Sequence, residues 1–387
     1  MANTVIESDL SLVKDIAKLG GGSLKKCFQC ATCSVVCNLS SDDRPFPRKE
    51  MIWAQWGLKD KLLSDPDVWR CYQCGDCSVY CPRGAKPAEV MGAIRNYSFK
   101  NYAAPKFMGT LLSSPKYLPV LFGIPIVLFL LVLSALGALS GVLSGPIAFT
   151  RFDNYVDVIF ITVSVLVLLA LGSGILKFWQ NMDNNNAHGD RYGKKGIFQS
   201  ILLAAEEVLT HRNFKKCDAN NLRYTGHLAL FYGFIALFIV TSIVFIGDRV
   251  FHMVLPMSQT NPVKIFANLG AIALIIGCSV AVYNRVGRRT QAGESSYYDW
   301  LFLGILFFIG VSGLLTEIAR LAGLAPVAYW SYFVHLVLVF CLIAYFPYSK
   351  FAHLLYRFVA IVYARYAGMS EPAQAAASET TEAKSVA

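Results

Sequence analysis

The sequence lacks the motifs of several common classes of enzyme. No glycine-rich nucleotide fingerprint stands at a strand–helix turn, because Gly20-Gly21-Gly22 forms a loop before a cysteine run and not a phosphate cradle. A hydrolytic triad pattern is also absent. We therefore expect no nucleotide or flavin site in the chain itself and assign no catalytic residue, so that any two-electron chemistry belongs to other molecules.

The first 20 residues lack the basic start and apolar core of a signal peptide, so we expect the N-terminal region to stay in the cytoplasm. The formal net charge of +10 has no nucleic-acid-binding motif beside it, and no nucleic-acid partner is expected. Because 55% of the residues are hydrophobic, we interpret the charge as Lys and Arg at the inner face of a membrane.

Apolar residues are distributed unevenly along the 387 residues, and the pattern predicts an all-α protein of two domains and a tail. Residues 1–110 have the composition of a soluble domain and lack the β-branched alternation of strands. Residues 111–366 hold long apolar runs typical of transmembrane helices. Residues 367–387 are rich in Ala, Ser, Thr and Glu without an apolar pattern, which predicts a disordered tail.

Eight of the eleven cysteines form two runs with the same C-x2-C-x2-C-x3-C spacing. The first run is Cys27, Cys30, Cys33 and Cys37, and the second is Cys71, Cys74, Cys77 and Cys81, followed by Pro82. This spacing is typical of bacterial ferredoxins with two [4Fe–4S] clusters, in which the fourth cysteine of each run binds the other cluster. Disulfides are disfavoured in the cytoplasm, and structural zinc usually takes two C-x2-C pairs.

By this rule, one cluster is expected on Cys27, Cys30, Cys33 and Cys81, and the other on Cys71, Cys74, Cys77 and Cys37. Asn38 takes the place of the usual proline after the first run, which affects only the local turn. Cys278 and Cys341 are expected to be buried packing residues in apolar helices, and the role of Cys217 stays open.

The segment "RPFPRKEMIWAQWGLKDKLL…VWRCYQCGDCSVYCP" resembles the small iron–sulfur subunit of heterodisulfide reductases. It is also similar to the C-terminal half of the iron–sulfur subunits of succinate dehydrogenases. Between the runs, Arg48–Leu58 is expected to be helical, and Asp65-Pro66-Asp67 resembles a helix start. The resemblance covers about residues 20–100 and implies an α-helical ferredoxin domain.

Six apolar runs are long enough to cross a membrane. They are Leu118–Leu143, Val156–Lys177, Gly226–Gly247, Ile265–Tyr283, Trp300–Ile318 and Val327–Phe346. Lys and Arg are concentrated in the 180–225 loop and after the fourth run, which places these loops, the N-terminus and the C-terminus on the cytoplasmic side. Gly196–Leu209 is amphipathic and is expected to lie on the inner membrane surface. No buried carboxylate chain is visible, so we expect no net proton pumping by this chain.

Histidines in or beside membrane spans are candidates for haem ligands, because His pairs on facing helices hold b-type haem in helical bundles. The candidates are His227, His335, His353, His211 and His252, whereas His188 lies in a polar loop and is expected to be solvated. His335 and His353 are 18 residues apart, which on one straight helix puts them on the same face about 27 Å apart. Lys350, Arg357 and Arg223 are expected either to pair with haem propionates or to lie at the inner membrane face.

The segment "HLVLVFCLIAYFPYSKFAH" resembles the last helix of the cytochrome b subunit of respiratory nitrate reductases, and "GHLALFYGFIALF" resembles an earlier helix of it. The resemblance implies that His335 binds an outer haem and His353 an inner one. His227 and His353 are expected at a similar depth in the membrane, so His227 is the expected partner of His353. The second histidine of the earlier helix corresponds to Leu237 in this sequence, so the partner of His335 stays open. It is either His252 or His227. If it is His227, then His211 binds the inner haem. Two haems are expected, and one is the alternative.

The order of these parts closely resembles the membrane subunit of the quinone-interacting membrane-bound oxidoreductases of sulfate-reducing bacteria. That resemblance implies a multi-pass subunit of the cytoplasmic membrane: an oxidoreductase with a ferredoxin domain followed by a six-helix cytochrome b bundle. It also implies menaquinol as the donor, flavin-containing heterodisulfide-reductase-like partners and adenylylsulfate reductase as the final acceptor. The alternatives are a membrane subunit of a heterodisulfide-reductase-type or other respiratory reductase, or an iron–sulfur subunit on a haem-free anchor.

Overall fold

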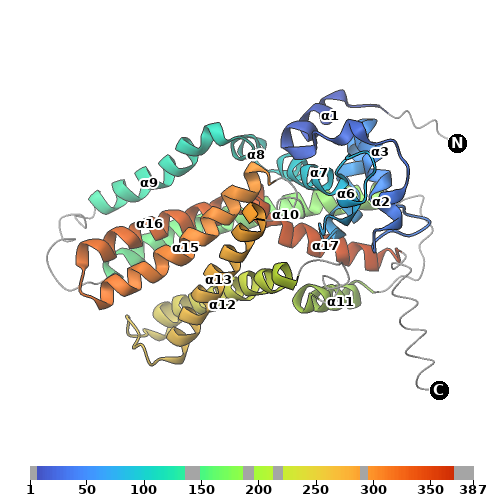
Figure 1. The fold of residues 1–387 in the computed structure, drawn as a ribbon. Coiled ribbons are helices and arrows are strands. Elements are labelled where there is room, and N and C mark those ends of the chain that lie inside the picture. Colours follow the sequence, from blue (N-terminus) through green and yellow to red (C-terminus); the bar gives the residue numbers. More distant parts are fainter. Residues whose placement is uncertain (1–6, 136–148, 186–195, 212–220, 288–294, 370–387) are drawn as a thin grey trace, which may run out of the picture.

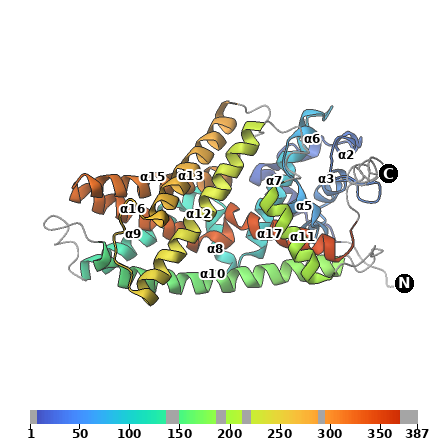
Figure 2. The same cartoon turned by 90° about the horizontal axis from the view of Figure 1, so that it is seen from below.

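The computed structural model describes residues 7–135, 149–185, 196–211, 221–287 and 295–369, and the described chain is helical throughout, with no strand. This confirms the expected all-α class. Residues 370–387 of the predicted tail, together with Cys217 and His188, lie outside the described residues. Figures 1 and 2 show an N-terminal group of short helices at one end of a bundle of long helices.

Short helices and turns make up the N-terminal domain. They are α1 (Leu10–Ile16), a π-helical turn (Ala17–Gly21), a 3-10 turn (Leu24–Lys26), α2 (Thr32–Val35), α3 (Arg48–Gln55), α4 (Lys59–Leu63), α5 (Asp67–Arg70), α6 (Asp76–Val79) and α7 (Pro87–Tyr102). The side chain of Asp9 caps α1, since it accepts hydrogen bonds from the backbone N–H groups of Ser11 and Leu12. The expected helix at Arg48 is present as α3, and α5 begins at Asp67 as expected.

Longer helices follow the short connecting helix α8 (Lys106–Leu112). They are α9 (Leu118–Ala135), α10 (Thr150–Asn185), α11 (Ile197–Thr210), α12 (Asn221–Phe251), α13 (Pro262–Gly287), α15 (Tyr297–Leu321), α16 (Ala325–Ala344) and α17 (His353–Tyr366). Six of the described helices are long and apolar enough to cross a membrane, namely α9, α10, α12, α13, α15 and α16. Each of the six predicted spans therefore corresponds to a helix, although residues 136–143 of the first span lie outside the described residues, and the chain is a multi-pass membrane protein.

The two parts share one apolar core. Trp69 of α5 stacks on Tyr356 of α17 with ring centroids 4.9 Å apart, and Phe178 of α10 meets the Trp69 ring edge-on at 6.1 Å. Tyr102 at the end of α7 also packs on Phe178, at 5.6 Å. Figure 2 shows α10 running along the bundle until it reaches the N-terminal domain beside α17. The domain with the cysteine runs is therefore fixed against the bundle by buried aromatic rings.

Glycines let α12 and α13 approach closely. A Cβ atom on Gly277 would lie 2.4 Å from the backbone nitrogen of Leu230, and one on Gly233 would lie 2.7 Å from that of Leu274. Backbone atoms have little freedom to move aside, so side chains at these positions would force the helices apart. Small residues at helix contacts are typical of membrane bundles, where close van der Waals packing drives association.

The expectation that His335 and His353 lie on one straight helix is wrong. Helix α16 ends at Ala344, two 3-10 turns follow at Phe346–Tyr348 and Lys350–Ala352, and α17 begins at His353. Pro347 is the physical cause, since it has no backbone N–H and disfavours the helical conformation in the preceding residue. The 27 Å separation therefore does not apply.

Candidate functional site

The two cysteine runs adopt the same backbone path. In the first, Gln29 (φ 58°) and Ala31 (φ 69°) have left-handed conformations, and α2 begins immediately afterwards. In the second, Gln73 (φ 53°) and Gly75 (φ 98°) occupy the equivalent positions before α6. Left-handed residues other than glycine cost about 1–3 kcal/mol each and persist where the surroundings require them, often at functional sites. Here they curl each loop, so that its first three cysteines lie on one short turn.

The thiols come together across the runs. The Cys33 thiol lies within electrostatic range of Cys27, Cys30 and Cys81. In the same way, Cys77 interacts most strongly with Cys71 and Cys74, and then with Cys37. These are the two sets of four that the ferredoxin spacing predicts. All ten described cysteines are free thiols, so no disulfide joins them in the described part of the chain.

Burial disfavours the thiolate form of these cysteines when no cation is bound. Burial, with neighbouring sulfur atoms, raises the pKa of Cys33 to about 11 and that of Cys37 to about 12. Such thiols lose their protons when a cation binds the sulfur. Backbone N–H groups of Gln73 and Ala85 already donate to the sulfurs of Cys71 and Cys81, at 3.3 Å each. The thiol-only donor set and its N–H···S bonds fit iron–sulfur clusters.

Three of the candidate histidines lie at the end of the bundle that meets the N-terminal domain. The rings of His211, at the end of α11, and His227, near the start of α12, have centroids 5.1 Å apart. His353, the first residue of α17, is within electrostatic range of His227. The structure thus brings together the pair His227–His353 and adds His211 beside it.

His353 has the orientation of a metal ligand. Its Nδ1 lies 2.6 Å from the carbonyl oxygen of Lys350, so an N–H at Nδ1 would donate there and leave Nε2 as the available nitrogen. Burial lowers the pKa of His353 to about 4, against the raising effect of that hydrogen bond. The imidazole is therefore neutral at pH 7, which is the form that binds a haem iron.

His335 lies apart from this group, in the middle of α16. Its Nδ1 is 3.1 Å from the carbonyl oxygen of Ile309 and 3.1 Å from the hydroxyl of Ser312, both on α15. Gly313 makes room for the ring, because a Cβ there would lie 3.1 Å from its Cε1 atom. Among the contacts of the described residues, none joins His335 to another histidine.

His252 is exposed just beyond the end of α12 and does not join the His211, His227 and His353 group. Arg223 and Arg357, which we considered as partners of haem propionates, bind main-chain carbonyls of the second cysteine loop instead. Lys350 forms an ion pair with Asp299 at the start of α15. Sequence reasoning missed Arg95 of α7, which binds the same loop, since nothing in its local pattern distinguishes it from a surface arginine.

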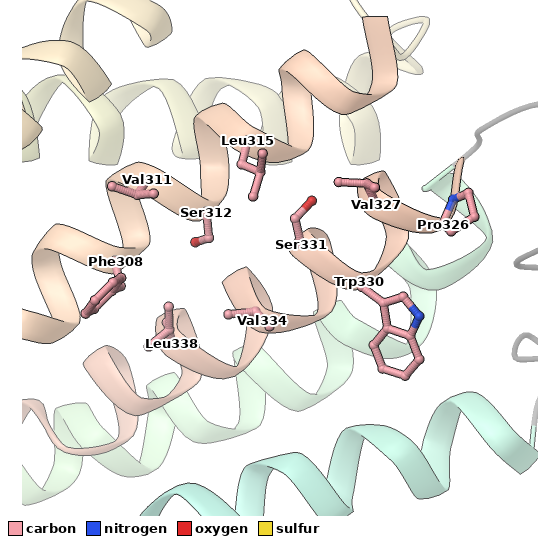
Figure 3. A pocket seen from close by; sticks show the side chains of 10 residues that line it. All are labelled: Phe308, Val311, Ser312, Leu315, Pro326, Val327, Trp330, Ser331, Val334 and Leu338. Carbon is pink, nitrogen blue, oxygen red and sulfur yellow. The ribbon is translucent and has the colours of Figure 1, made fainter. Parts of the chain in front are cut away.

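An apolar groove of about 620 Å³ lies between α15 and α16, next to His335. Figure 3 shows Val311, Ser312 and Leu315 of α15 facing the same space as Ser331 of α16. Ser312 lines this groove and is also the hydroxyl that contacts the His335 ring. The groove thus connects through one hydrogen bond to a candidate haem ligand.

Comparisons with known proteins agree with this arrangement. Residues 23–85 match the 4Fe-4S dicluster domain family. One subunit of the dihydromethanophenazine:CoB–CoM heterodisulfide reductase of Methanosarcina mazei is 30% identical over 203 residues, which cover 48% of this chain and 73% of that relative. The corresponding protein of Methanosarcina thermophila is 28% identical over 197 residues, covering 46% of this chain and 69% of that relative.

One subunit of the H2:CoB-CoM heterodisulfide,ferredoxin reductase of Methanothermobacter marburgensis is 38% identical over 99 residues, or 25% of this chain. The chain spans 53% of that relative's length. No solved structure matches. The Methanosarcina mazei match covers 48% of this chain, which is more than the part that precedes the first span at Pro115. The similarity therefore extends into the membrane bundle. The chain therefore belongs to the family of these heterodisulfide reductase subunits, as a multi-pass iron–sulfur membrane component of an oxidoreductase complex.

Proposed function

We propose that this chain carries electrons between menaquinol in the membrane and a soluble redox partner, through b-type haem and two [4Fe–4S] clusters. The observation that carries the proposal is the direct contact between the second cysteine loop and the helices that bear the histidines. Arg223, four residues before His227, and Arg357, four residues after His353, both bond to carbonyls of residues 69–73. Cofactors at the two sites would be neighbours, as electron transfer requires.

The eight run cysteines are the proposed cluster ligands, in the two crossed sets. For haem, His353 with His227 is the pair best supported, because both lie at the same end of the bundle and His353 is neutral and oriented. His211 is the alternative partner for His227. His335 is the proposed ligand of a second haem nearer the other end, where its Nδ1 contact with Ile309 leaves Nε2 available. When bound, haem supplies one-electron steps between a two-electron carrier and the clusters.

The groove beside His335 is the proposed site for the menaquinol. Its lining residues, such as Phe308, Leu315 and Val334, suit an isoprenoid chain, and Ser312 offers a hydroxyl near the end of the groove toward His335. The Methanosarcina relatives are named for dihydromethanophenazine. For the present chain, the carrier's identity rests on the resemblance to quinone-interacting oxidoreductases.

We propose that the N-terminal domain, α11 and α17 face the cytoplasm, where flavin-containing heterodisulfide-reductase-like subunits dock. Adenylylsulfate reductase is then the final acceptor. The second candidate is a heterodisulfide-reductase-type complex, which the Methanosarcina and Methanothermobacter relatives favour directly. The partners that co-purify with the chain from its own cells distinguish the two, because only the first complex contains adenylylsulfate reductase.

The test is reduction of the purified full-length chain in lipid nanodiscs by a menaquinol analogue, followed in the visible spectrum. We expect reduction of b-type haem and then bleaching of the cluster absorbance, with an oxidised mediator as final acceptor. His353→Ala should abolish the haem signal attributed to the inner site, whereas His252→Ala should leave it unchanged. Intact clusters without any haem band would contradict the haem path and support an iron–sulfur subunit on a haem-free anchor.

A further inference from the structure

Three arginines from three helices converge on the second cysteine loop. Arg95 of α7 donates to the carbonyl oxygens of Val68 (2.8 Å) and Cys71 (2.6 Å). Arg357 of α17 donates to Trp69 (3.3 Å) and Cys71 (3.1 Å), and Arg223 of α12 donates to Gln73 (2.7 Å) and Tyr72 (3.2 Å). Each guanidinium therefore lies beside the loop that carries Cys71 and Cys74.

The charges of these arginines act on one another and on nearby charged side chains. Arg95 lies within electrostatic range of the Cys71 thiol and of both Arg357 and Arg223. Lys350, which pairs with Asp299, is also within electrostatic range of Arg95. The junction between the second loop and the bundle thus gathers three guanidinium charges at the main-chain carbonyls of that loop.

The first cysteine loop has a different environment. The basic residues around it, such as Lys25, Lys26, Arg48 and Arg83, are exposed, as is Cys30 itself. Water and salt screen exposed charges, whereas charges that are partly buried retain more of their effect. Arg95, Arg223 and Arg357 are partly buried between the two domains. The two loops therefore differ in electrostatics although their backbones match.

We propose that Arg95, Arg223 and Arg357 hold the reduction potential of the cluster at Cys37, Cys71, Cys74 and Cys77 above that of the cluster at the first run. A reduced cluster carries one more negative charge than an oxidised one, and nearby cations stabilise the reduced form. An electron then resides preferentially on the cluster next to the membrane bundle. This inference rests on the proposed pair of clusters and adds the direction of the potential difference between them.

The experiment is a redox titration of the full-length chain in nanodiscs, with the cluster signals followed by electron paramagnetic resonance. Cys81→Ser, which should disturb only the first-run cluster, assigns the two signals. The variants are Arg95→Gln, Arg223→Gln and Arg357→Gln, each with the corresponding Lys variant, which keeps the charge. Arg320→Gln, on the last turn of α15, is the control and should change neither midpoint potential.

We expect each Gln variant to lower the midpoint potential of the second-loop cluster by about a tenfold change in its reduced-to-oxidised ratio, equal to about 59 mV for one electron. The first-run cluster should stay within a third of that shift, and the Lys variants should recover most of it. Equal shifts of both clusters, shifts in the Lys variants as large as in the Gln variants, or a wild-type second-loop cluster with the lower potential would each overturn the inference. Absence of iron from the wild-type chain would instead refute the proposed function.

Discussion

Replacing Lys49 by Met should destabilise the N-terminal domain strongly, because Lys49 is the central cation of a buried ionic cluster. Its ammonium group contacts Glu50, Asp65 (2.5 Å) and Asp67 (2.9 Å). The side chains of Asp65 and Asp67 are only 2% and 5% exposed. Burial raises the pKa of Glu50 well above its usual value, against the lowering effect of the Lys49 charge.

The expected cost follows from what remains after the substitution. Arg44 still pairs with Asp67 at 3.0 Å, but its contact with Asp65 is longer, at 3.6 Å. Asp65 is therefore left as a buried carboxylate whose remaining cation contact is the longer one with Arg44, and breaking a buried ion pair typically costs about 3–5 kcal/mol. Its Oδ1 also accepts the backbone N–H of Asp67 at the start of α5, the helix that leads to Cys71. In a domain of this size, the melting temperature should fall by about 10 °C or more.

The assay is thermal unfolding of the full-length chain, followed by loss of the cluster absorbance. Lys14→Met on the exposed face of α1 is the matched control and should change stability by less than about 0.5 kcal/mol. The double variant Lys49→Met/Asp65→Asn should recover part of the loss, since it removes the uncompensated charge. A Lys49→Met protein that melts with the wild type would refute the reasoning.

Three further predictions test other parts of the structure. Cys33→Ser and Cys81→Ser should each remove the same cluster, so the double variant should lose no more iron than either single variant. The double variant Cys33→Ser/Cys37→Ser should disturb both clusters. The measurement is the iron content per chain. Gly277→Leu should force α12 from α13 and cost about 1–3 kcal/mol or more, whereas Gly172→Leu, which meets open space, should be tolerated. Burial raises the pKa of Asp67, but the ion pairs with Lys49, Arg44 and Arg70 outweigh burial and hold it below its usual value. The stabilisation by Asp67 is therefore complete above the unfolded pKa of about 3.9 and is lost as the pH falls through the folded pKa. The difference in free energy of unfolding between the wild type and Asp67→Asn should therefore decrease below about pH 4.

The fold class and the spans could be predicted from sequence because apolar runs and cysteine spacing are local patterns. The six helices found correspond to the six predicted spans, and cysteines of the two runs lie within electrostatic range of one another. The break after α16 is not evident from periodicity, because the spacing of His335 and His353 fits one continuous helix. Pro347 is the local signal for that break.

The arrangement around the second cysteine loop could not be predicted, because it is made by residues far apart in the sequence. Arg95 and Arg357 meet at the carbonyl oxygen of Cys71 only after α7 and α17 pack together. The contact between Tyr72 and Glu207 of α11, at 2.8 Å, is another such case. Local patterns indicate which residues can bind a metal, whereas tertiary packing decides which charges surround them.

The central claim is that an iron–sulfur domain exchanges electrons with haem in the membrane. A dithionite-reduced minus oxidised spectrum of the purified full-length chain, with iron and haem quantified, tests it most directly. Two [4Fe–4S] clusters and two haems predict about ten iron atoms per chain and a sharp b-type α-band. About nine irons would mean a single haem, held by His227 with His353 or with His211. About eight irons without an α-band would contradict the haem path, and an iron content near zero would contradict the whole account.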